Sequence, residues 1–169
     1  MNPQTPAPSG PSREALLSTV EDTQAWGARL GALLRAGDLL LLTGDLGAGK
    51  TTLVQGIAVG LGVRGPITSP TYVIARVHAS LTQGPELVHA DAYRLNGLAE
   101  LDDLDLDASL DEVVTVVEWG HGLAELLSES YLEVTLRGHE ARTVGIVGHG
   151  ARWTAPEASA TLDQLISLA

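Results

Sequence analysis

The chain has 169 residues, which is about the length of a single domain. Cysteine is absent, so the sequence excludes disulfide frameworks, thiol catalysis and zinc sites with cysteine ligands. Ten basic residues against 21 acidic ones give a formal net charge of −11, whereas proteins that hold nucleic acid by themselves are usually basic.

Residues 1–12 are rich in proline, glycine and serine, which predicts a disordered tail before a single domain over residues 13–169. In the first half of that domain the predicted helices and strands alternate. The expected elements are an extended piece over 16–20, a helix over 21–35, a strand over 38–43 and a helix over 50–61. We expect Asp22 or Thr23 to cap the first helix and Gly37 to close it. Consecutive leucines in the strand indicate a central strand that is covered on both faces.

The second half of the domain is rich in predicted strands. The expected elements are a hairpin of strands 72–79 and 86–93, a buried strand over 113–117, a hairpin of strands 131–136 and 143–147, and a helix over 157–168. Short helices are expected in the acidic stretch 100–111 and over 123–127. The whole pattern predicts a three-layer α/β fold, in which antiparallel strands are added to a parallel central sheet.

Residues 44–51 read Gly-Asp-Leu-Gly-Ala-Gly-Lys-Thr, the pattern of a phosphate-binding (Walker A) loop, which predicts a fold of the P-loop NTPase type. Glycines let backbone N–H groups approach phosphate oxygens, and the next helix adds the positive end of its dipole. We expect Lys50, the only lysine in the chain, to reach the β- and γ-phosphates and Thr51 to hold Mg²⁺. The expected nucleotide contacts are Asp45, Leu46, Gly47, Ala48, Gly49, Lys50, Thr51 and Thr52.

A strand that ends in an acidic residue completes the magnesium site of such proteins. Glu118 after the strand 113–117 fits this description, and so does Asp91 within the strand 86–93. The chain has no Asn-Lys-x-Asp motif for guanine, so ATP is a better expectation than GTP.

Four segments together resemble the bacterial TsaE (YjeE) family, the ATPases of tRNA threonylcarbamoyladenosine synthesis. The segments are residues 44–52, Ser69-Pro70-Thr71-Tyr72, His89-Ala90-Asp91-Ala92-Tyr93-Arg94-Leu95 and Val117-Glu118-Trp119. The resemblance implies that Thr51 and Glu118 hold Mg²⁺ and that Thr71 lies in a switch-like loop near the γ-phosphate. It also implies that Asp91 lies near the metal or the attacking water, and that Trp119 lies beside the nucleotide.

The same resemblance implies a role as one subunit of a complex with TsaB and TsaD, which transfers threonylcarbamoyl to adenosine 37 of tRNA. The ATPase would be weak alone and would meet tRNA only through the complex. No arginine finger is evident in the chain, although Arg94 is a candidate, so we expect the partners to stimulate hydrolysis.

Two alternatives stay open. One is a nucleotide-gated interaction module in which hydrolysis only resets the shape. The other is a small-molecule kinase, although the arginines are scattered and no lid-like insertion is visible.

No apolar run in the chain approaches the roughly 18 residues of a membrane span, and no secretory signal is visible. We therefore expect a cytoplasmic protein without a membrane partner and without direct binding to DNA.

Overall fold

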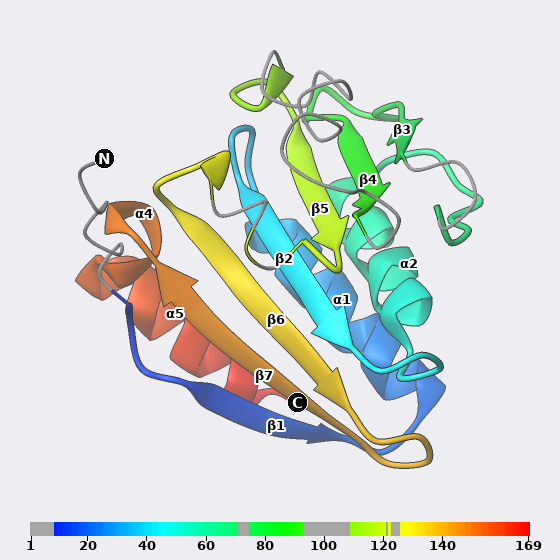
Figure 1. Cartoon of the computed structure of the whole chain (residues 1–169), viewed down its shortest axis with the longest axis vertical. Helices are drawn as coiled ribbons and strands as arrows, with labels where there is room; N and C mark the ends of the chain where they lie inside the picture. The colour runs from blue at the N-terminus through cyan, green and yellow to red at the C-terminus, as the bar shows by residue number, and fades with distance from the viewer. Residues whose placement is uncertain (1–8, 71–74, 93–108, 121, 123–125) are drawn as a thin grey trace.

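The computed structural model describes residues 9–70, 75–92, 109–120, 122 and 126–169. The described residues form one seven-stranded sheet of order β1-β7-β6-β2-β5-β4-β3 (Figure 1). The strands are β1 (Arg13–Leu17), β2 (Leu39–Gly44), β3 (Ala75–His78), β4 (Leu87–Asp91), β5 (Val114–Glu118), β6 (Tyr131–Arg137) and β7 (Arg142–His149). The helices are α1 (Val20–Leu33), α2 (Lys50–Leu61), α4 (Ala151–Thr154) and α5 (Pro156–Ser167).

The centre of the sheet is parallel and its margins are antiparallel. Strand β2 pairs in parallel with both β5 and β6, and β4 pairs in parallel with β5. Strands β7, β1 and β3 add antiparallel pairs on either side. This arrangement confirms the predicted fold class and both predicted hairpins.

Strand β2 is buried on both faces, as its run of leucines predicts. Leu40 and Leu42 join the larger apolar cluster, in which residues of α1, α2 and α5 also take part. Leu39 and Leu41 point the other way and join a second cluster with residues of β4 and β5. Because both faces of β2 pack against apolar residues, its sequence does not alternate between apolar and polar residues.

Helix α1 begins with a reciprocal capping box at Thr19, so the predicted caps are wrong. The Thr19 hydroxyl accepts a hydrogen bond from the Asp22 N–H at 3.0 Å, and the Asp22 carboxylate accepts one from the Thr19 N–H at 2.9 Å. The cap therefore lies before the residues that the sequence singled out, and Asp22 is its third-position partner. The helix also ends earlier than expected, at Leu33, and Gly37 lies in the turn before β2, where its N–H bonds Val113 O at 2.9 Å.

Several predicted boundaries differ from the observed ones. The extended piece expected over 16–20 is strand β1, which ends at Leu17 because the capping box already starts α1 at Val20. Helix α4 has four residues and carries no periodic pattern that could have announced it. Within the predicted tail, Ser9 forms a bridge to His149, and Gly10 donates a hydrogen bond to Gly148 O at 2.8 Å.

Some predicted elements lie wholly or largely outside the described residues. They are residues 1–8 of the tail, the start of the strand 72–79, the acidic stretch 100–111 and the helix 123–127. No helix in the described part of the chain is both long enough and apolar enough to cross a membrane.

Candidate functional site

The predicted phosphate-binding loop connects the end of β2 to the start of α2. Gly47 and Gly49 have positive φ angles of 81° and 100°, a conformation that glycine adopts without the clash a side chain would cause. Helix α2 begins at Lys50 and ends at Leu61, as predicted. No side chain caps its first turn. The free N–H groups and the dipole of a helix start form a suitable place for an anion.

Lys50 is almost fully enclosed by the loop that precedes it. Its side chain is only 7% exposed, and Nζ donates to Gly44 O at 2.8 Å and to Asp45 O at 3.1 Å. Nζ also lies 4.8 Å from the centre of the Trp119 ring, which is within the range of a cation–π contact. Two backbone carbonyls and an aromatic face therefore hold this ammonium group.

The two candidate carboxylates lie at the same edge of the sheet as this loop. Asp91 and Glu118 end neighbouring parallel strands and are direct partners in register, and both are buried. Glu118 is also in register with Leu42 of β2, two residues before Gly44. The carboxyl ends of β2, β4 and β5 therefore bring Lys50, Asp91 and Glu118 to one region, which is where ligands bind in open α/β sheets.

Trp119 follows Glu118 in an uncommon backbone conformation. Its φ angle is 57°, the only positive value among the described non-glycine residues, and its side chain is 37% exposed. Positive φ at a bulky residue is rare and is often found at functional sites. The structure places Trp119 next to Lys50 Nζ, and its position beside a nucleotide stays a prediction.

His89 is fully buried and contacts Glu118 directly. Its Nε2 lies 2.7 Å from Glu118 Oε1. An ionised carboxylate can only accept, so Nε2 carries the bridging proton in that state. His89 Nδ1 has no hydrogen-bond partner within the described residues. This contact fixes the direction of the Glu118 side chain.

A second histidine lies close to this pair. Burial lowers the pKa of His78 below its ordinary value of 6.5, and nearby His89 lowers it further. A lowered pKa favours the uncharged form of His78 near neutral pH.

Sequence reasoning named His89 in a motif but gave it no role. The alternation of a strand puts His89 and Asp91 on one face, and this was the available signal. The pairing of β4 with β5, which brings His89 to Glu118, could not be deduced from that local pattern.

The remaining predicted residues divide into described and undescribed ones. Thr51 and Thr52 are half-buried in the first turn of α2, and Ala48 is buried. Leu46 is 89% exposed at the loop. Thr71 and Arg94 lie outside the described residues.

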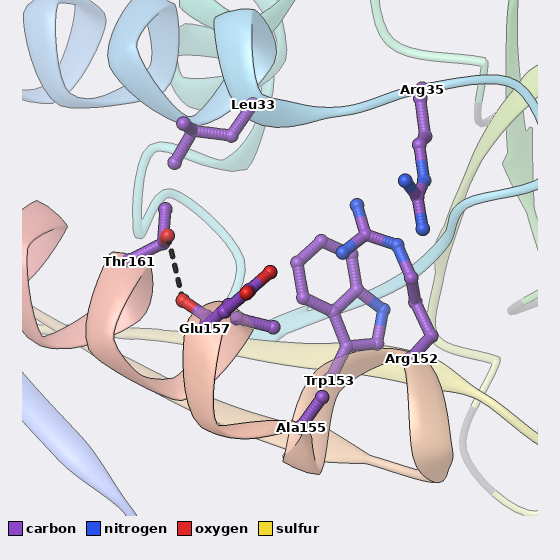
Figure 2. A pocket seen from close by; sticks show the side chains of 8 residues that line it. Leu33, Arg35, Arg152, Trp153, Ala155, Glu157 and Thr161 are labelled. Carbon is purple, nitrogen blue, oxygen red and sulfur yellow. Dashed lines mark hydrogen bonds between the residues drawn. The ribbon is translucent and has the colours of Figure 1, made fainter.

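A pocket of about 330 Å³ lies at the opposite edge of the sheet, near the start of β2 (Figure 2). Its lining residues are Leu33, Arg35, Arg152, Trp153, Ala155, Glu157, Ala158 and Thr161. The Arg152 guanidinium lies 3.9 Å from the centre of the Trp153 ring and bonds both carboxylate oxygens of buried Asp38 at 3.2 Å. These contacts join α4 to the start of β2, so we assign them a structural role.

Comparisons with known proteins point to one family. A family model described as "Threonylcarbamoyl adenosine biosynthesis protein TsaE" matches residues 17–144. The chain is 56% identical to the tRNA threonylcarbamoyladenosine biosynthesis protein TsaE of Streptomyces coelicolor over 79% of this chain and 95% of that protein. It is 35% identical to the protein of the same name from Bacillus subtilis, over 79% of this chain and 84% of that one. The crystal structure of Bacillus subtilis YdiB matches with a TM-score of 0.69 and 28% identity, covering 92% of this chain and 94% of that chain.

Proposed function

The chain belongs to the TsaE family of tRNA threonylcarbamoyladenosine biosynthesis, and from that premise we propose that it is the Mg²⁺-dependent ATPase of this process. The observation that carries the proposal is the loop between β2 and α2. It combines an uncapped helix start, two glycines with positive φ and the enclosed Lys50 ammonium group. The N–H groups of the helix start and the ammonium group are the donors that a nucleoside triphosphate requires, and the glycines let the backbone come close to it.

The residues at the site fit both a triphosphate and a magnesium ion. The Lys50 ammonium group already donates hydrogen bonds to two carbonyl oxygens of the loop, so it is placed to donate to phosphate oxygens there. Glu118 supplies a buried carboxylate, and Thr51 supplies a hydroxyl at the start of α2. Magnesium is usually held by one or two such side chains together with substrate phosphates and water.

Each residue then has a definite task in hydrolysis. On nucleotide binding, Lys50 exchanges carbonyl oxygens for phosphate oxygens and neutralises their charge. Thr51 and Glu118 would hold the ion, which supplies charge stabilisation to the phosphoryl group when it is bound. His89 keeps the Glu118 carboxylate in one orientation. Asp91, in register with Glu118, faces the same region and is suited to orient the attacking water.

We assign the same protein a place in a complex with TsaB and TsaD in the cytoplasm, with tRNA bound by the complex. The support is the family membership and the net charge of −11, which opposes direct binding to tRNA. Phosphoryl transfer without an arginine finger is slow, because such a group can contribute a factor of about 10³–10⁵. We therefore expect TsaB and TsaD to stimulate hydrolysis.

A nucleotide-gated module is the second candidate, and the Lys50 contacts favour it. Because Nζ bonds Gly44 O and Asp45 O, a triphosphate must displace these bonds and change the loop. A Glu118→Gln variant that binds ATP without cleaving it separates the two functions. One round of tRNA modification without further rounds would indicate that hydrolysis only resets the protein.

The proposed function is tested by the threonylcarbamoyladenosine content of tRNA in cells that lack this gene. We expect the wild-type gene to restore the modification and Lys50→Ala to leave it absent. Arg137→Ala is the matched control, because Arg137 is an exposed residue that pairs with Glu14 at 3.0 Å. Normal modification in the deleted strain would overturn the proposal.

A further inference from the structure

The turn between β6 and β7 lies beside the phosphate-binding loop, although about ninety residues separate them in sequence. Gly44 is in register with Leu136 of β6, so the chain that leaves β6 passes the loop directly (Figure 1). A Cβ added to Gly47 would lie 3.9 Å from His139 Nδ1 in this turn. From the first residue of β7, Arg142 Nε donates a hydrogen bond to Ala48 O at 2.8 Å.

The Arg142 side chain also packs against Gly49. A Cβ on Gly49 would lie 2.6 Å from Arg142 Nε and 3.2 Å from its Cδ, both shorter than an ordinary contact. The φ of 100° at Gly49 favours glycine, and a side chain there would also displace Arg142 from its present position. Arg142 therefore contacts the loop at two neighbouring residues, Ala48 and Gly49.

The contact determines where the next N–H group points. A trans peptide bond is planar, and its C=O and N–H point in opposite directions. Arg142 holds the Ala48 carbonyl on the side of the β6–β7 turn, so the Gly49 N–H faces away from that turn. No hydrogen bond within the described residues uses this N–H, whereas the Ala48 N–H is already bonded to Asp45 O at 3.0 Å.

On the basis of the proposed function, we propose that Arg142 is a positioning residue that presents the Gly49 N–H to the phosphates of the nucleotide. Among the described arginines, Arg13, Arg137 and Arg152 each pair with a carboxylate. Unlike these three, Arg142 donates its hydrogen bond to a carbonyl oxygen, and that acceptor belongs to the loop itself. Its positive charge is therefore not neutralised by that contact and adds to the attraction for an anion.

The proposal is tested by calorimetric titration with two probes, MgATP and inorganic tripolyphosphate. Arg142→Met keeps an apolar stem against Gly49 but removes the donor and the charge. We expect this variant to bind both probes about tenfold more weakly, which corresponds to about 1.4 kcal/mol. Arg142→Lys keeps a cationic donor and is expected to recover most of the affinity. Arg137→Ala, on the same hairpin, is expected to bind both probes like wild type.

The melting temperature without ligand separates positioning from a structural role. We expect it to change little in Arg142→Met, while the rise in melting temperature on adding MgATP becomes smaller. Unchanged affinity for both probes in Arg142→Met, or weaker binding of MgATP alone, would overturn the role of Arg142. If wild type binds neither probe, the proposed ATPase function itself is wrong.

Discussion

His89 and Glu118 form a hydrogen-bonded pair that is buried in the sheet, next to the proposed site. Both residues are almost without exposure, and one hydrogen bond of 2.7 Å joins them. Removing one partner of such a pair leaves a charge or a donor in a place that water does not reach. The pair therefore matters for stability as well as for the orientation of Glu118.

We expect His89→Ala to lower the free energy of unfolding by about 3 kcal/mol, because Glu118 loses its buried partner. ATP hydrolysis should fall at the same time, since the Glu118 side chain is no longer held. Urea unfolding and a hydrolysis assay on the same preparation measure both effects. His149→Ala is the matched control, because His149 pairs with Glu133 at 3.1 Å in a less buried setting. Equal losses in the two variants would contradict the special role of His89.

Local patterns in the sequence name some residues of the proposed site and miss others for a physical reason. Lys50 and Thr51 belong to one short motif whose chemistry is readable without the fold. His89 and Arg142 act through contacts with residues far away in the chain, Glu118 and Ala48. The first contact depends on the pairing of β4 with β5, and the second on the pairing of β2 with β6 and of β6 with β7.

At the scale of elements, helices α1 and α2 pack through glycines that leave no room for a side chain. Gly27 and Gly31 on α1 face Gly56 and Gly60 on α2 across the contact. An added Cβ on any of the four would lie 2.1–2.6 Å from a backbone oxygen of the other helix. Because α2 starts at the phosphate-binding loop, this close contact helps to fix the position of the site.

We expect Gly56→Ala to lower the free energy of unfolding by about 2 kcal/mol, although alanine favours a helix. The added methyl group would meet Gln24 O at 2.2 Å, so the two helices must move apart. Chemical denaturation measures the change. Gly145→Ala in β7 is the control, since an added Cβ there has its nearest neighbour at 3.9 Å. A stable Gly56→Ala protein with unchanged ATP binding would contradict this account.

The elements were predicted most accurately where the sequence has strong boundary signals. Helix α2 agrees in both ends because the glycine-rich loop precedes it and Gly62 ends it in the left-handed conformation. The ends of α1 were predicted less well, because Thr19, Asp22 and Thr23 are all good capping residues. Only the hydrogen bonds show that Thr19 is the cap.

At the scale of the whole molecule, the net charge of −11 opposes association with another polyanion. We expect the purified protein to show no binding to tRNA at physiological salt, with a Kd weaker than about 10⁻⁴ M. Fluorescence anisotropy of labelled tRNA measures this, with the assembled complex as the positive control. Micromolar binding by the protein alone would contradict the assignment of tRNA binding to its partners.

The most direct test of the central claim is the rate of ATP hydrolysis by the purified protein, alone and with TsaB and TsaD. We predict slow hydrolysis that the partners stimulate and that requires Mg²⁺, with both rates lost in Lys50→Ala. Hydrolysis that persists in Lys50→Ala would show that the loop between β2 and α2 is not the site. Equal rates with and without the partners would contradict the proposed role in the complex.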